Sequence, residues 1–280
     1  EDLLAQASWL VHCQRQGRLA FASAGWPGAV GVVTGMSARG FALALNAVSS
    51  PEGMARTGYP MLLFLRTVLE DARDFDQAVQ LCCEQRLFAP GLITLVGVEN
   101  HQRVVVERTP ARHALRRPAA EEPLVATNDY RKLFPPQARA GPEMYQTTCS
   151  RFDALGEMFT AAARRHVSDQ ELLYSLTDPR VLQGITAQHI VMRPRQQAMR
   201  PAPDLFAGSV IDLQPAGTAA HLNPGAAQGN GNAVVNPLVT IADQAQRIGL
   251  TTGRRRQGGD QPERFEAKVL EFVHQHVPIG

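Results

Sequence analysis

Residues 29–46 read AVGVVTGMSARGFALALN, and this stretch carries the clearest fold signal in the chain. Two apolar runs, at 29–34 and 41–46, are linked by a segment that contains Gly35 and Gly40. Short apolar runs separated by turn residues are typical of antiparallel strands. Similar runs at 7–13 and 18–24 precede them, so the sequence predicts a four-stranded antiparallel meander.

The apolar periodicity changes after this meander. Pro60 lies near the start of a predicted helix with Leu65 and Leu69 on one face. Asp74 is a typical N-cap for a second helix. Further along the chain we expect strands at 92–98, 103–108, 123–127 and 186–193, and helices at 143–166 and 168–176. This order predicts an α+β fold with antiparallel sheets inside and helices outside.

The composition excludes several classes of protein. The 280 residues are 44% hydrophobic, which is too apolar for a wholly disordered chain. A net charge of +2 gives no electrostatic reason to expect a nucleic-acid partner. No segment approaches the ~18 apolar residues of a membrane span, and the first residues, EDLL, lack the basic start of a signal peptide. We therefore expect a cytoplasmic protein without a membrane span.

The chain is expected to have three parts. Residues 1–214 form the α+β domain. Residues 215–261 are rich in Gly, Ala and Asn and contain no aromatic residue, which predicts a loop or a disordered tail. Residues 262–277 predict an amphipathic helix with Phe265, Val269 and Phe272 on one stripe. Docking of this helix on the domain or on a partner is left open.

The spacing of sequence motifs alone does not identify a reaction or a metal site. The four cysteines, Cys13, Cys82, Cys83 and Cys149, match neither a disulfide framework nor paired CxxC ligands. No HExxH or GxSxG motif occurs. We therefore expect no metal and no organic cofactor, and we expect the cysteines to be small residues of the core.

A set of short sequence motifs occurs in a fixed order along the chain. They are Trp26-Pro27-Gly28, TGMSARG (34–40), ALALN (42–46), FLRTVLEDA (64–72), ATND (126–129) and SRF (150–152). Together they resemble the N-terminal-nucleophile hydrolases of the penicillin acyltransferase type, relatives of acid ceramidase and choloylglycine hydrolase, over about residues 1–206. The resemblance implies a four-layer αββα sandwich. It also implies cleavage or transfer at an amide-linked acyl group of a small-molecule substrate. Whether the protein forms a homo-oligomer is left open.

The resemblance also implies a catalytic site. In that family an N-terminal cysteine, freed by self-cleavage, is the nucleophile, and its own α-amino group is the base. Matched residue by residue, Asn46 and Asn128 occupy oxyanion-hole positions, and Arg151 orients the surroundings of the nucleophile. The structural alternative is a strand-end cap or turn for each asparagine, and a helix-surface ion pair for Arg151.

The nucleophile itself is expected upstream of Glu1, on a first strand that is absent from this chain. Cys13 lies inside a predicted strand and Cys149 in a predicted helix, so both are expected to be structural. Ser37 stands where the family often has asparagine. Two hypotheses follow: a cysteine-nucleophile amidohydrolase or acyltransferase, or a non-catalytic relative that binds an acylated ligand or a protein partner.

Overall fold

The computed structural model describes residues 8–26, 28–120, 122–160, 167–201, 211–212 and 238–242. All of them belong to one compact unit, Glu1–Gln246. The helix expected at 262–277 lies outside the described residues, as does most of the 215–261 segment. No helix in the described ranges is both long and apolar enough to cross a membrane.

The first sheet has seven antiparallel strands in the order of the chain, β1 to β7. The strands are β1 (Trp9–Cys13), β2 (Phe21–Gly25), β3 (Thr34–Ser37), β4 (Phe41–Asn46), β5 (Gly91–Val96), β6 (Arg103–Arg108) and β7 (His113–Arg116). The predicted meander is therefore confirmed, and it extends beyond the four strands expected. Only the connection from β4 to β5 is long, and it contains two helices.

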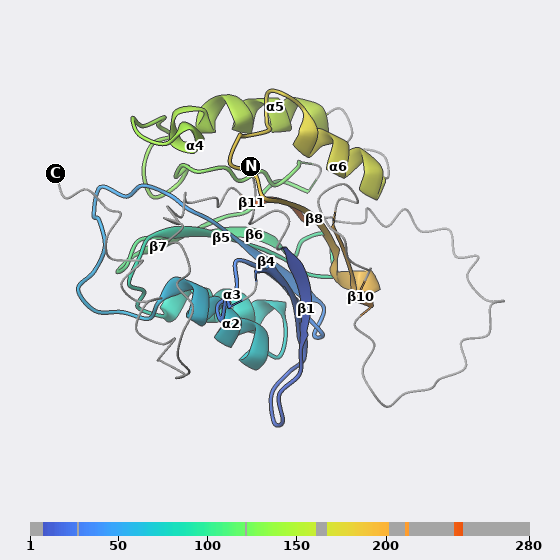
Figure 1. Ribbon diagram of the computed structural model, residues 1–280. Helices are drawn as coiled ribbons and strands as arrows, with labels where there is room; N and C mark the ends of the chain where they lie inside the picture. Colours follow the sequence, from blue (N-terminus) through green and yellow to red (C-terminus); the bar gives the residue numbers. More distant parts are fainter. Residues whose placement is uncertain are drawn as a thin grey trace, which may run out of the picture. The chain divides into compact units, whose positions relative to one another are not determined.

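Helices α2 (Met61–Asp71) and α3 (Phe75–Glu84) cover one face of this sheet (Figure 1). Asp74 is the N-cap of α3, because its side chain accepts a 2.8 Å hydrogen bond from the backbone N–H of Gln77. Leu65 and Leu69 of α2 pack against strand residues such as Leu43. The helix starts predicted from sequence and the burial of Leu65 and Leu69 are confirmed here, whereas Leu62 and Leu63, also expected on the apolar face of α2, are each 39% exposed.

The opposite face of β2–β4 packs against a second antiparallel sheet. Its strand order is β10 (Ile211–Asp212), β9 (Ala198–Pro201), β8 (Gln188–Arg193) and β11 (Leu238–Ala242). Ile190 and Met192 of β8 contact a surface of small residues that includes Ala42 and Ala44. Small side chains let the two sheets approach closely, so a buried apolar core forms between them.

Helices also lie on the far side of the second sheet. They are α4 (Glu143–Gln146), α5 (Thr148–Thr160) and α6 (Asp169–Thr177). Helix α6 contacts β8 and β11 (Figure 1). A capping box formed by Ser168 and Glu171 fixes the start of this helix. Within this unit the contacts run from α2 and α3 through both sheets to α6.

Three local predictions differ from the structure. The strand expected at 29–34 begins instead at Thr34 and includes Gly35, where an added Cβ would lie 2.5 Å from Cδ1 of Leu69. Gly35 therefore permits close packing of α2, whereas Gly40, with a φ of +78°, makes the turn. Residues 123–127 form no strand. Leu238–Ala242 form β11 inside the segment expected to be a loop, because a short β-branched run is lost in an averaged composition.

Candidate active site

Asn46 is the last residue of β4, and it is 4% exposed. It alternates with Ala42 and Ala44, so its side chain lies on the face of the sheet that is turned away from α2 and α3. Leu92 of β5 is its neighbour across the ladder. The residues after Asn46 leave the sheet, and the segment that contains Asn128 approaches this end of β4.

Asn128 is 3% exposed and is held through both its backbone and its side chain. Its backbone N–H donates to Oγ1 of Thr148 at 2.8 Å. Its Nδ2 donates to the carbonyl oxygen of Ala47 at 2.9 Å, which ties it to the residue directly after Asn46. The structure therefore brings the two predicted asparagines to one place. The bond to Ala47 is also the contact that a strand-end cap would make.

Arg151, in the first turn of α5, is completely buried. Its Nη2 donates to Oδ1 of Asn128 at 2.8 Å and also to the carbonyl of Met144, while its Nε donates to Oγ1 of Thr147 at 3.1 Å. The helix-surface ion pair considered as an alternative is wrong, because these contacts face inward. Arg151 thus lies directly behind Asn128.

A network of small polar groups supports this arrangement, and the sequence reasoning missed its centre. Thr148 lies 2.9 Å, through Oγ1, from both Oδ1 of Asp129 and Oγ1 of Thr127. Asp129 also pairs with Nε of Arg131 at 3.0 Å. Thr148 begins α5, so these bonds fix the 127–129 segment to that helix. Nothing in the local sequence indicates that Thr148, rather than Thr147, lies at the centre of this network.

Glu107 of β6 is a second buried group that sequence reasoning missed. Its carboxylate, 0% exposed, accepts hydrogen bonds of 2.9, 2.9 and 2.8 Å from the backbone N–H groups of Arg131, Lys132 and Leu133. Arg116 lies 3.5 Å away through Nε. Burial lowers the pKa of Arg116, while the charge of Glu107 opposes that shift. Glu107 therefore anchors the chain just after Asn128 to the sheet.

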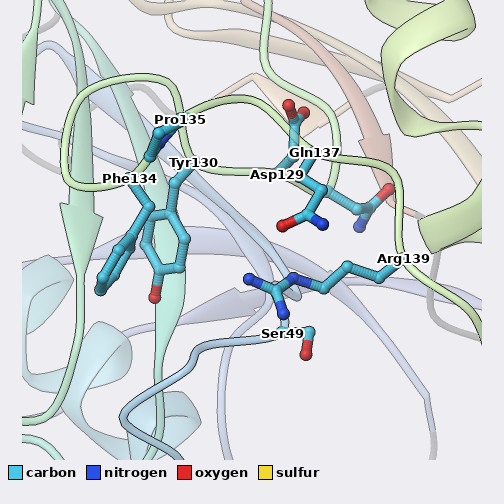
Figure 2. Close-up of a pocket in the computed structure, with 8 residues that line it drawn as sticks. Ser49, Asp129, Tyr130, Phe134, Pro135, Gln137 and Arg139 are labelled. Carbon is cyan, nitrogen blue, oxygen red and sulfur yellow. The ribbon is translucent and has the colours of Figure 1, made fainter.

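A pocket opens beside Asn128 (Figure 2). It is small and partly open to solvent, with a cavity volume of about 10 Å³, which is room for about one water molecule. Its lining residues are Ser49, Asn128, Asp129, Tyr130, Phe134, Pro135, Gln137 and Arg139. The Tyr130 hydroxyl donates to the carbonyl of Arg108 at 2.7 Å, and burial raises its pKa to about 12, so the phenol stays protonated at neutral pH. Asn46 and Arg151 do not line the pocket, and Arg151 contacts it through Asn128.

Two of the four cysteines, Cys13 and Cys149, bear on the search for a nucleophile in this chain. Cys13 packs on the side of the sheet that carries α2 and α3, and burial raises the pKa of its thiol. Cys149, in helix α5, is the nearer one to Asn128, and its Sγ lies 3.9 Å from Oδ2 of Asp129. Among the described residues no cluster of His, Cys, Asp or Glu could hold a metal ion.

Antiparallel sheets packed face to face and flanked by helices agree with the fold that the resemblance to N-terminal-nucleophile hydrolases implied, and two solved structures of amide hydrolases share this fold. A Caenorhabditis elegans ortholog of N-acylethanolamine-hydrolyzing acid amidase matches with a TM-score of 0.53 and 21% identity, over 76% of this chain and 89% of that one. A mutant of the conjugated bile acid hydrolase from Clostridium perfringens matches with a TM-score of 0.50 and 10% identity, over 74% of this chain and 84% of that one.

The sequence itself gives the narrower assignment. The chain belongs to the acyl-coenzyme A:6-aminopenicillanic acid acyl-transferase family, whose sequence model matches residues 4–179. This range includes Asn46, Asn128 and Arg151. No curated protein matches the chain.

Proposed function

We propose that this protein is a cysteine-nucleophile amidohydrolase or acyltransferase that acts on amide-linked acyl groups through an acyl-enzyme. The observation that carries the proposal is the pair formed by Asn128 and Arg151 at the end of β4, in a chain that belongs to an acyltransferase family. The fold shared with two amide hydrolases supports the same reaction class.

Asn128 is proposed to stabilise the oxyanion that forms when the acyl carbonyl is attacked. A side-chain amide has two N–H donors, and the carbonyl of Ala47 accepts one of them. The second is proposed to donate to the acyl oxygen. Asn46, or a backbone N–H beside it, is proposed as the other donor of the oxyanion hole. Donors that are held in place before the reaction stabilise the transition state without reorganisation.

The proposed nucleophile is an N-terminal cysteine, encoded upstream of Glu1 and freed by self-cleavage. Its α-amino group, with a reference pKa near 7.7–8.0, would accept the thiol proton. Cys13 is not proposed for this role, because its burial and raised pKa oppose formation of a thiolate. The non-catalytic relative is the second candidate, and the positions of Cys13 and Cys149 favour it if no upstream cysteine exists.

The experiment starts from the gene. The coding sequence upstream of Glu1 is determined first. We expect it to encode a Cys-Thr or Cys-Ser motif followed by Arg and Asp. The full-length protein is then incubated with an N-acyl amide, and its mass is measured. A mass increase equal to the acyl group, lost when that cysteine is changed to alanine, is expected. If both the upstream cysteine motif and the acyl adduct are absent, the result would favour the non-catalytic binding protein over the enzyme.

A further inference from the structure

We propose that Thr148, oriented by Asp129, is a positioning residue that holds Asn128 in the direction needed to donate a hydrogen bond to an oxyanion. The inference rests on the proposed function in one respect, namely that Asn128 is the donor that the reaction uses. It adds two residues outside the predicted catalytic set, and both act through Asn128 rather than on the substrate.

Thr148 and Arg151 hold two different parts of Asn128. Oγ1 of Thr148 accepts a 2.8 Å hydrogen bond from the backbone N–H of Asn128, whereas Nη2 of Arg151 donates a 2.8 Å bond to its side-chain Oδ1. Both residues belong to α5, and their spacing of three places them on the same face of that helix. One helix therefore fixes the backbone and the side chain of Asn128 separately.

Both contacts are needed to fix the direction of the amide. An amide that is held only at its oxygen is free to turn about that point, and its NH₂ group then changes direction. When the backbone is held as well, Nδ2 is directed at the carbonyl oxygen of Ala47, 2.9 Å away. The amide group is planar, so these three contacts also fix the direction of its second N–H. That second N–H is the proposed oxyanion donor.

Asp129 determines how the hydroxyl of Thr148 is used. A hydroxyl group can either donate or accept, and toward the N–H of Asn128 it must accept. Oδ1 of Asp129 lies 2.9 Å from Oγ1 of Thr148, and a carboxylate only accepts. Oγ1 of Thr127 is equally close, but a carboxylate is the stronger acceptor. The hydroxyl hydrogen of Thr148 therefore points at Asp129, and a lone pair is left for Asn128.

Asp129 is itself held by contacts that lead back to α5. It is 5% exposed, and it pairs with Nε of Arg131 at 3.0 Å. The guanidinium carbon of Arg131 lies 3.6 Å from the ring centroid of Phe152, which is a residue of α5. The contacts therefore form a closed path that begins and ends on one helix. A buried polar network with satisfied members is rigid, so the hydroxyl of Thr148 is oriented before any substrate binds.

The first measurement requires no activity. Backbone amide hydrogen exchange is followed by NMR in the full chain with Thr148→Val, which keeps the shape of the side chain and removes the hydroxyl. We expect the N–H of Asn128 to exchange about 10- to 100-fold faster, while the amides of β4 change little. Thr148→Ser should restore most of the protection. Thr160→Val, the same change at the exposed far end of α5, should leave exchange at Asn128 unchanged.

The second measurement uses the full-length enzyme and follows release of 4-nitroaniline from its hexanoyl amide. Thr148→Val should lower kcat about 10- to 100-fold and change KM by no more than about twofold, because the aim of Asn128 matters chiefly in the transition state. Rates are referred to the folded fraction, which urea denaturation gives, so a purely structural role would leave kcat unchanged. Thr148→Ser should recover most of kcat, and Thr160→Val should not alter it.

A double-mutant cycle tests the part of Asp129. Asp129→Asn alone should speed exchange at Asn128, and it should add nothing to Thr148→Val, because Asp129 acts through the hydroxyl that Thr148→Val removes. The proposal is overturned by additive effects, by unchanged exchange at Asn128 in Thr148→Val, by exchange that is equally faster throughout β4, or by a normal kcat in Thr148→Val. If the natural full-length protein releases no amine, the proposed function fails, and exchange at Asn128 still decides whether Thr148 holds it.

Discussion

Arg151 donates a 2.8 Å hydrogen bond from Nη2 to Oδ1 of Asn128, and both side chains are almost completely buried. Arginine has only donors, so this bond identifies the oxygen of the Asn128 amide. The NH₂ group must then point the other way, toward the carbonyl of Ala47. Arg151 therefore sets the direction in which Asn128 donates hydrogen bonds, and that direction decides whether Asn128 can serve an oxyanion.

Replacement of Asn128 should reduce turnover far more than it reduces substrate binding. In the full-length enzyme, Asn128→Ala removes one oxyanion donor, a loss of about 2.7–4 kcal/mol of transition-state stabilisation and roughly 10²- to 10³-fold in turnover. Asn128→Asp should be at least as damaging, because it replaces a donor with an acceptor. KM should change less than kcat, since the interaction tightens in the transition state. Steady-state kinetics measure both.

Gln80→Ala is a suitable control for Asn128, because it removes an exposed amide from α3. It should leave kcat unchanged. An Asn128→Ala enzyme with normal kcat would show that this side chain is only the cap of a strand end.

Removal of the buried arginine should destabilise the protein. Arg151→Ala leaves the carbonyl of Met144 and Oδ1 of Asn128 without their donor. One buried and one partly buried acceptor that lose their partner should together cost about 2–6 kcal/mol in the free energy of unfolding. Urea denaturation measures this value. Arg180→Ala, which removes an exposed arginine after α6, should change it little; equal effects of the two substitutions would contradict the role given to Arg151.

Glu107 should control the order of the segment that follows Asn128. Glu107→Gln replaces one of the two acceptor oxygens with a donor, so at least one of the N–H groups of 131–133 loses its acceptor. We expect a loss of about 1–3 kcal/mol in stability and faster amide hydrogen exchange at these three residues. Glu157→Gln, on the exposed side of α5, is the control. Unchanged exchange at 131–133 would show that Glu107 is not the anchor.

His189 should make the protein less stable in acid. It is 2% exposed, neither ring nitrogen has a hydrogen-bond partner among the described residues, and burial lowers its pKa from 6.5 to about 4. The unfolded chain therefore binds this proton first. Stability falls as the pH decreases from about 6.5 to about 4, by a total of about 3 kcal/mol.

His189→Leu tests this directly. Urea denaturation at pH 7 and at pH 4.5 should show a smaller difference for this variant than for the natural chain. His101→Gln, which changes an exposed histidine in the turn between β5 and β6, should preserve the full difference. An identical acid dependence in His189→Leu and the natural chain would assign the effect to other groups.

The local sequence pattern alone was sufficient to predict the helices and strands whose formation depends on neighbouring residues. The apolar run Phe41–Asn46 predicted β4 with the bounds that the structure has, and Asp74 predicted the start of α3. The same reasoning failed at Gly35, which was interpreted as part of a turn. Its reason for being glycine is Leu69, a contact across more than thirty residues of chain that no local window contains.

The candidate site shows the same division. The sequence determined which residues could form the site, because the motifs that contain Asn46, Asn128 and Arg151 occur in a fixed order along the chain. Only the tertiary structure decided that Asn128 meets Ala47, 81 residues earlier, and that Arg151 turns inward to hold it. A charged side chain is buried only where fixed partners replace its water, and here those partners come from separate parts of the chain. For that reason the roles of Glu107 and Thr148 could not be predicted from their neighbours in the sequence.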